Sequence, residues 1–210
     1  MNALLDESDL VERSRRGDLE AFNSLVALYQ DRVYGLCLRM LGAQQAAEDA
    51  AQETFLSAYR NVAGMRGPSV RAWLLRIASN ACIDELRRRR RHPQLSLDAP
   101  TPGSDDHDRA LDVTDSEAGP QERALGAELS AALQAELRML PADQRLAVIL
   151  SDVQGLSYEE VALAMSSSLG TVKSRISRGR ARLRLALQAR PELFGDLVRP
   201  IDRSPSVERR

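Results

Sequence analysis

The sequence predicts an all-α protein, and three observations lead to this prediction. Alanine, leucine and arginine, which are strong helix formers, are abundant. Aromatic residues make up only 4% of the chain, and runs of strand-forming residues are nearly absent. Apolar residues instead recur at spacings of three and four in several long segments. The length of 210 residues allows one domain or two small ones.

The charge of the chain is segregated, so the formal net charge of −1 is misleading. Residues 87–91 are an unbroken arginine run, whereas residues 93–122 contain eight acidic residues and a single arginine. Prolines, glycines and aspartates leave that acidic stretch without a sustained apolar period. We therefore predict two helical domains, 1–92 and 123–190, joined by a flexible acidic linker at 93–122. The sequence pattern of the tail, residues 191–210, does not indicate a structure or a function.

The first two long helices of the N-terminal domain are predicted from their apolar stripes. One stripe runs over residues 22–40, and its helix should end at Gly42, because glycine favours the position after a helix C-terminus. A second helix is predicted over 46–61. Its outer side presents a compact acidic and amide patch, Glu48, Asp49, Gln52 and Glu53. The residues alone leave open whether this patch is a solvated face or a binding site.

A third helix is predicted over 70–91, after a loop that contains Gly64, Gly67 and Pro68. Its outer row leads into the arginine run and consists of Arg76, Asn80, Asp84 and Arg87. Arginine neutralises phosphates, and an asparagine amide can pair with the edge of a base. This row therefore indicates a nucleic-acid surface. Trp73 begins the helix, and we assign it to the core rather than to stacking on an unpaired base.

Residues 156–187 have the pattern of a helix-turn-helix. Ser157 and Glu160 form a capping box for the first helix, and Thr171 is a possible cap for the second. The packing side of the second helix is Val172, Ile176, Gly179 and Leu183. Its other sides are hydroxylic and basic, with Thr171, Lys173, Ser174, Arg175, Ser177, Arg178 and Arg182. Because residues 173–190 contain seven cations and no acidic residue, we favour major-groove binding over a merely solvated helix.

The sequence predicts no catalytic residue, metal ion or cofactor. Cys37 and Cys82 lack the spacing of metal ligands and should be buried, reduced thiols, as expected in the cytoplasm. His92 and His107 have no acidic or cysteine partners at ligand spacing, and there is no P-loop motif. No signal peptide and no membrane-spanning apolar run is found, so no membrane insertion is expected.

Taken together, four segments resemble the extracytoplasmic-function (ECF) group of bacterial RNA polymerase sigma factors, the two-domain alternative sigma factors of the sigma-70 family. The segments are GDLEAFNSLVALYQDRVYGLCLRML (17–41), AEDAAQETFLSAYRN (47–61), RAWLLRIASNACIDELRRRR (71–90) and the stretch 140–184 around the helix-turn-helix. The resemblance implies a sigma region 2 helical bundle, a sigma region 4 helix-turn-helix, and binding to bacterial core RNA polymerase and promoter DNA. The function it implies is promoter-specific initiation of transcription, in which the −10 and −35 elements are read and melted DNA is stabilised.

The resemblance also implies roles for individual residues. The residues that it implies for core polymerase binding are Asp49, Gln52 and Glu53. Contacts to the −10 element fall to Met65, Arg66, Arg76, Asn80, Arg87 and Arg88. Contacts to the −35 element fall to Thr171, Lys173, Ser174, Arg175, Ser177, Arg178 and Arg182. An anti-sigma factor is a further expected partner, because members of this group are commonly held by one.

The chain departs from the family at the turn of the helix-turn-helix, where Ser166, Ser167 and Ser168 stand in place of a sequence such as Gly-Ile-Pro. Serine takes positive φ less readily than glycine, so the turn is expected to be strained. The acidic linker could also compete with DNA for the basic faces of the free protein. The alternative to a sigma factor is a helix-turn-helix regulator that binds promoter DNA without being a polymerase subunit.

Overall fold

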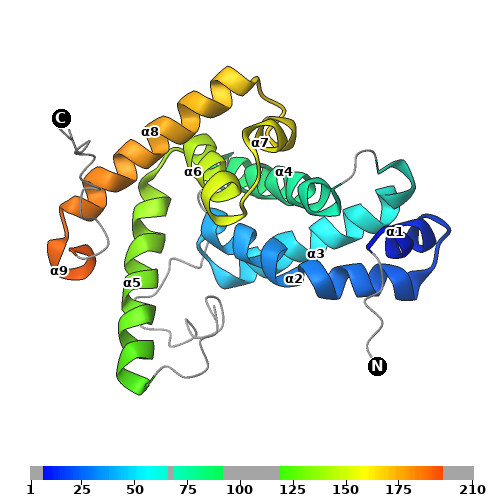
Figure 1. Cartoon of the computed structure of the whole chain (residues 1–210), viewed down its shortest axis with the longest axis horizontal. Helices are drawn as coiled ribbons and strands as arrows, with labels where there is room; N and C mark the ends of the chain where they lie inside the picture. Colours follow the sequence, from blue (N-terminus) through cyan, green and yellow to red (C-terminus); the bar gives the residue numbers. More distant parts are fainter. Residues whose placement is uncertain (1–6, 66–68, 92–118, 196–210) are drawn as a thin grey trace, which may run out of the picture.

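The computed structural model describes residues 7–65, 69–91 and 119–195, and every regular element in these ranges is a helix (Figure 1). The predicted all-α class is therefore confirmed. None of the helices in the described part of the chain is long and apolar enough to cross a membrane. Most of the predicted linker, together with Arg66, lies outside the described residues.

The N-terminal domain is a bundle in which the three long helices pack pairwise around one core. Its elements are α1 (Glu7–Arg15), α2 (Leu19–Leu41), α3 (Gln44–Asn61), the short 3₁₀ turn η1 (Val62–Gly64) and α4 (Val70–Arg91). The bounds of α4 are those predicted from the apolar spacing. Gly42 ends α2 as expected, with φ of 73° and its N–H donating to the Leu38 carbonyl at 2.8 Å. α3 begins two residues earlier than predicted, because Gly42 reverses the chain at once.

The C-terminal domain consists of shorter helices around the helix-turn-helix. Its elements are α5 (Pro120–Met139), α6 (Ala142–Val148), the π-helical segment η4 (Ile149–Val153), α7 (Tyr158–Ala164), α8 (Leu169–Gln188) and α9 (Pro191–Phe194). α5 begins with Pro120, whose fixed φ suits the first turn of a helix, so the last residues of the stretch assigned to the linker are helical. In the tail, α9 packs on α8 and buries Phe194.

The ends of α7 and α8 set the geometry of the helix-turn-helix. The predicted capping box is present, because Ser157 accepts a hydrogen bond from the Glu160 N–H and the Glu160 carboxylate accepts one from the Ser157 N–H. Ser166 takes a left-handed φ of 48°, as the serine-rich turn led us to expect. The prediction that Thr171 caps α8 is wrong. Ser168 has the extended backbone of an N-cap, and its hydroxyl accepts from the Thr171 N–H, so Thr171 is already inside the helix.

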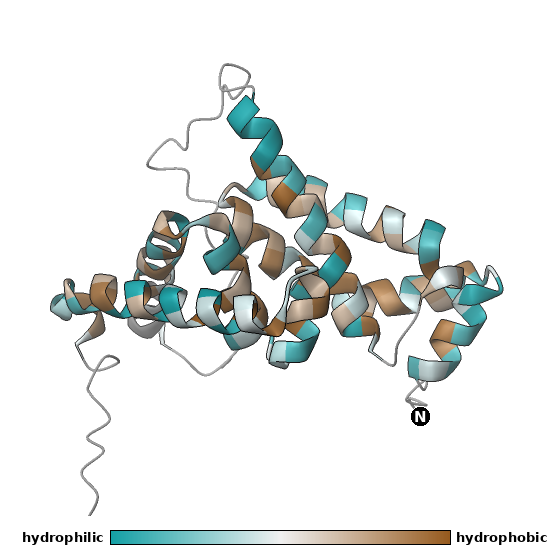
Figure 2. Cartoon of the chain, turned by 90° about the horizontal axis from the view of Figure 1, so that it is seen from above, coloured by the Kyte–Doolittle hydropathy of each residue, from teal (hydrophilic) through white to brown (hydrophobic). Residues whose placement is uncertain are grey.

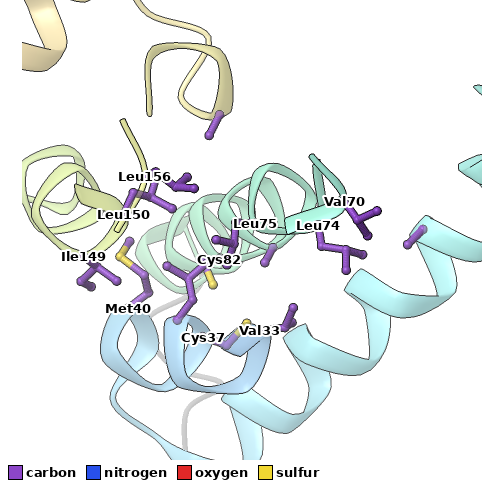
Figure 3. Packing of buried hydrophobic residues seen from close by; sticks show 14 of the residues in the cluster. Val33, Cys37, Met40, Val70, Leu74, Leu75, Cys82, Ile149, Leu150 and Leu156 are labelled. Atoms are coloured by element: carbon purple, nitrogen blue, oxygen red, sulfur yellow. The ribbon is translucent and has the colours of Figure 1, made fainter. Parts of the chain in front are cut away.

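The two domains pack against each other through one continuous apolar cluster. α4 lies along α7, and the C-terminal end of α2 meets α5 and α6 (Figure 1). Met40 reaches from α2 toward Ile149 and Leu150, and all three side chains are fully buried (Figure 3). The outer faces of the helices are mostly hydrophilic, and the last turns of α4 are hydrophilic all round (Figure 2).

Candidate nucleic-acid interface

The buried side of α8 fixes the orientation of the helix. Val172, Ile176 and Gly179 are buried against the rest of the domain, as predicted from their spacing. A Cβ atom on Gly179 would lie 2.6 Å from Cγ2 of Val148 and 3.3 Å from the Gln144 carbonyl oxygen. There is no room for a side chain, so α8 rests directly on α6. The opposite side of α8 therefore faces outward.

The outward side of α8 carries cations that no acidic side chain compensates. Lys173, Ser177 and Arg178 are exposed, with Thr171 and Ser174 half-buried beside them. Among the residues that the structure describes, neither Lys173 nor Arg178 takes part in a salt bridge. Uncompensated cations beside hydroxyl groups at the start of a helix suit contacts to phosphates and base edges.

Arg175 and Arg182, two of the predicted −35 residues, are instead engaged within the protein. Arg175 donates from Nε to Asp143 Oδ2 at 2.9 Å and from Nη1 to Ser167 Oγ at 2.7 Å. Arg182 donates from Nη1 to Gln144 Oε1 at 2.9 Å. These bonds hold α8 to α6 and to the turn before it. Helical spacing could not reveal them, because the acceptors on α6 precede α8 by about thirty residues.

A second arginine, Arg180, attaches α8 to η4 and to the start of α7. Arg180 donates to both carboxylate oxygens of Asp152, at 2.9 and 2.5 Å, and to the Tyr158 hydroxyl at 3.3 Å. The hydrogen bond to Asp152 raises the pKa of the Arg180 guanidinium. Sequence reasoning missed the roles of Asp143 and Asp152. The available signal was that both are acidic residues shortly before the basic helix α8.

The predicted outer row of α4 is exposed, as expected. Its residues are Arg76, Asn80, Asp84 and Arg87. Arg87 pairs with Asp84 at 3.1 Å, but both side chains are about 70% exposed, so the pair is weak and a phosphate could replace its carboxylate.

Arg88 and Arg89 both bond to Glu85 at 2.7 Å. Partial burial by itself would raise the pKa of Glu85, but these two guanidiniums hold it below its ordinary value.

The exposure of Met65, in the loop before α4, differs from the expected one. Met65 is only 6% exposed and packs in the core, and its carbonyl accepts a hydrogen bond from Arg15 at 2.8 Å. In this conformation the Met65 side chain is not available to a base, in contrast to its prediction as a −10 contact. Its apolar character, inside a loop with two glycines, was compatible with either role. Trp73 is half-buried against the core, in agreement with its assignment there.

The acidic patch of α3 is exposed and contains an apolar residue that sequence reasoning did not single out. Asp49, Gln52 and Glu53 lie on one side of the helix, and Leu56 follows at the next helical spacing with 45% of its surface exposed. Gln45 donates to the Asp49 carboxylate at 3.4 Å. An apolar centre with a polar rim is the arrangement found in protein interfaces. Its spacing from Asp49 was the signal that could have identified Leu56.

The candidate DNA face of α4 adjoins α7, the first helix of the helix-turn-helix. A shallow cleft has Arg76 of α4 on one side and Glu159, Leu163 and Ser166 of the helix-turn-helix on the other. In the described ranges, no group of three or more histidine, cysteine or acidic side chains is arranged to hold a metal ion.

Comparison with known families and solved structures agrees with this geometry. Residues 25–92 match the family Sigma-70 region 2, and residues 130–183 match Sigma-70, region 4. The chain is similar to the RNA polymerase sigma-H factor of Pseudomonas aeruginosa, with 40% identity over 87% of this chain and 94% of that protein. It is also similar to the ECF RNA polymerase sigma factor SigW of Bacillus subtilis, with 35% identity over 85% of this chain and 95% of the other.

Two solved structures resemble the fold. One is the sigma factor RpoE in complex with the anti-sigma factor NepR from Bartonella quintana, with a TM-score of 0.61 and 27% identity, covering 81% of this chain and 98% of that one. The other is CnrH in complex with the cytosolic domain of CnrY, with a TM-score of 0.59 and 25% identity, covering 88% of this chain and 97% of that one. Both sigma-70 regions match this chain, and the two relatives are similar to it over nearly their whole length. This chain therefore belongs to the ECF group of RNA polymerase sigma factors.

Proposed function

We propose that this sigma factor binds bacterial core RNA polymerase through α3 and recognises promoters through two separate basic faces, on α4 and on α8. The observation that carries the proposal is the division of exposed cations between two helices in different domains. Each of these helices lies in a segment that matches one of the two sigma-70 regions. The chain acts as an initiation factor and not as an enzyme.

For the −35 element, we assign base and phosphate contacts to the free side of α8. Its residues are Thr171, Lys173, Ser174, Ser177 and Arg178. Arg175 and Arg182 lie beside this surface, but their hydrogen bonds to α6 support a different role, in which they hold α8 at its angle to the DNA. A recognition helix that is held by its own domain loses less entropy when it enters the groove.

For the −10 element, we assign contacts to Arg76, Asn80, Arg87 and Arg88 on α4. Asn80 is the candidate for a base edge, because an amide can both donate and accept hydrogen bonds. The arginines neutralise the backbone of the melted strand. Arg66, at the preceding loop, stays a candidate for the same surface.

For the core polymerase, we assign the surface of Asp49, Gln52, Glu53 and Leu56 on α3. Leucine in the middle of polar residues provides the apolar area that stabilises an interface, and the carboxylates provide orientation. An anti-sigma factor is a further proposed partner, since one of the similar solved structures is a sigma factor in complex with an anti-sigma factor. We place the protein in the cytoplasm, where polymerase and chromosome are.

The test is in vitro transcription by purified bacterial core polymerase on a genomic fragment library, with and without this protein. Sequencing of the RNA 5′ ends should reveal new start sites that share two upstream elements. If no new starts arise and the protein does not bind core polymerase, but does bind promoter DNA alone, the chain is a conventional helix-turn-helix regulator.

A further inference from the structure

We propose that Arg15, on α1, is a positioning residue for −10 recognition, because it fixes the point from which the chain enters the connection between Met65 and Ser69. The inference rests on the proposed function, in which Arg66 and the outer row of α4 contact the −10 element. It extends that function by making the choice of −10 bases depend on a residue that is not itself assigned to DNA contact. Arg15 also precedes residues 25–92, the segment that matches Sigma-70 region 2.

The guanidinium of Arg15 joins α1 to the end of η1, against which α1 packs (Figure 1). Its Nη2 donates to the Met65 carbonyl at 2.8 Å, and its Nη1 donates to the Glu12 carboxylate, one turn earlier on α1, at 2.5 Å. The Met65 carbonyl belongs to the same planar peptide unit as the N–H of Arg66. Arg15 therefore fixes the plane of the peptide bond that leads into Arg66.

Met65 is restrained through its side chain and through both of its backbone polar groups. The side chain is 6% exposed and packs in the core. The N–H donates to the Val62 carbonyl at 3.1 Å, and the carbonyl accepts from Arg15. Of these restraints, the bond from Arg15 acts on the group nearest to Arg66. Its loss would free the direction in which the chain leaves Met65.

The other end of the connection is fixed by the start of α4. The Ser69 hydroxyl accepts from the Ala72 N–H at 3.1 Å, and the Ser69 carbonyl accepts from the Trp73 N–H at 3.1 Å. Val70, the next residue, is buried. Only residues 66–68 lie between the two fixed ends, and such a connection spans at most on the order of 14 Å. A short connection has few conformations, so a shift of the Met65 carbonyl changes the position of every side chain in it.

α1 is itself held firmly enough to act as a support. Arg13 donates from Nε to Asp18 Oδ2 at 2.9 Å, and Asp18 Oδ1 accepts from two backbone N–H groups at the start of α2, at 3.0 and 3.1 Å. Leu10 and Val11 are buried in the same core as the long helices. The end of α1 is therefore fixed to the beginning of α2, and Arg15 transmits this position to Met65.

The contact of Arg15 with Met65 contributes little to the stability of the bundle. Its Nε is buried and has no acceptor among the described residues, and an unsatisfied buried donor costs free energy that offsets the bond to the carbonyl. The ion pair with Glu12 is partly exposed, with 33% and 53% of the two side chains accessible, so it adds little. The main consequence of the contact is thus where the Met65 carbonyl lies. This distinguishes a positioning role from a merely structural one.

The test compares Arg15→Ala with two other variants. Arg16→Ala is the matched control, because it removes the same charge from the next residue, which is exposed and forms no salt bridge within the described ranges. Arg15→Lys is the conservative variant, since an ammonium group can donate to the same carbonyl. The thermal unfolding midpoints of all three should lie within about 4 °C of that of the unsubstituted protein.

The position of the connection would be measured in the free protein by hydrogen exchange of peptides that cover residues 62–74. Arg15→Ala should accelerate exchange in this segment by about three- to tenfold, the effect of one lost hydrogen bond. Arg15→Lys and Arg16→Ala should exchange as the unsubstituted protein does. Segments of α2 and α3 away from η1 should be unchanged in all variants.

The choice of bases would be measured by transcription with purified bacterial core polymerase and each variant. The template is one promoter at which the unsubstituted protein starts transcription, with its −10 bases randomised and its −35 element kept. Arg15→Ala should reduce the ratio of transcripts from preferred and other −10 sequences by at least about threefold, because base contacts need exact placement and phosphate contacts do not. Arg15→Lys and Arg16→Ala should keep the ratio.

The proposal is overturned if Arg15→Ala leaves the exchange of residues 62–74 unchanged, or if it keeps the −10 base preferences of the unsubstituted protein. An equal loss of transcription from all −10 sequences belongs to the second case, and would mean that Arg15 supports the fold or contacts only phosphate. A failure of the proposed function would be seen separately, as no polymerase-dependent transcription by the unsubstituted protein. The exchange measurement does not depend on that activity.

Discussion

Arg175 of α8 and Asp143 of α6 are joined by a hydrogen bond of 2.9 Å between Nε and Oδ2, and the same guanidinium donates to Ser167 in the turn of the helix-turn-helix. The residue therefore connects three parts of the motif. Ser167, in the serine-rich turn, serves as a hydrogen-bond acceptor for this guanidinium. The pair is partly exposed, so its direct contribution to stability is small.

This pairing predicts different consequences for two neighbouring arginines. Arg178→Ala should weaken −35-dependent initiation by about 1–3 kcal/mol if the side chain contacts a base, and the loss should disappear on a promoter with a scrambled −35 element. Equal loss on both promoters would mean that Arg178 contacts only phosphate.

Arg175→Ala should act through the position of α8. In a double-mutant cycle of thermal stability, Arg175→Ala and Asp143→Ala should be non-additive by roughly 0.5–1 kcal/mol. Asp143→Ala alone should also reduce −35-dependent initiation, although a carboxylate is not expected to bind DNA. An additive cycle, with full activity of Asp143→Ala, would instead place Arg175 among the direct DNA contacts.

Gly179→Ala should destabilise the C-terminal domain by about 1–3 kcal/mol, because its Cβ would overlap Val148 and press on the Gln144 carbonyl. Gly170→Ala is the matched control, since nothing lies within 4 Å of a Cβ at that position of the same helix. The control should be neutral or stabilising by up to about 1 kcal/mol. Thermal unfolding of the two variants distinguishes a packing effect from general helix propensity, and equal shifts would contradict the close contact of α8 with α6.

Leu56→Ala should weaken binding to core polymerase by about 1–2 kcal/mol, because an apolar side chain at the centre of an interface contributes more than the polar residues around it. Leu28→Ala on α2 is the control, since Leu28 is exposed to a similar degree, 58% against 45%. Affinity for immobilised core polymerase is the measurement. Similar losses in both variants, or in neither, would remove Leu56 from the proposed surface.

Deletion of residues 98–118 should increase promoter binding by the free protein if the acidic linker competes with DNA for the basic faces. The increase should shrink at high salt, because screening weakens interactions between exposed charges. An unchanged affinity at low salt would count against this competition.

Cys37 and Cys82 should resist alkylation in the folded protein. Both are buried and free of disulfides, and a hydrogen bond with Cys37 together with burial raises the pKa of the Cys82 thiol. The thiolate is the reactive form, so the raised pKa keeps Cys82 unreactive, and burial keeps oxidants away from Cys37. Mass spectrometry after iodoacetamide treatment should find modification only when denaturant is present. Rapid modification of the native protein would reveal an opening that exposes the core.

The sequence alone determined those features that depend on contacts near in the chain. The bounds of α4, the end of α2 at Gly42 and the capping box of Ser157 and Glu160 all follow from helical spacing and from backbone preferences of single residues. The exposed rows on α3, α4 and α8 followed in the same way, because one helix face repeats every three to four residues. The cap of α8 was misassigned by three residues, since several serines and a threonine in succession offered equivalent hydroxyl groups.

Only the tertiary structure decided which of the exposed-looking side chains remain free. Met65 is buried and Arg175 is bonded to Asp143, because partners from distant segments approach them once the helices pack. The same holds for Arg145, which lies in a short amphipathic segment and becomes buried only where α6 meets the end of α2. Local periodicity specifies a helix and its faces, whereas the partner of each face depends on long-range packing between segments about a hundred residues apart.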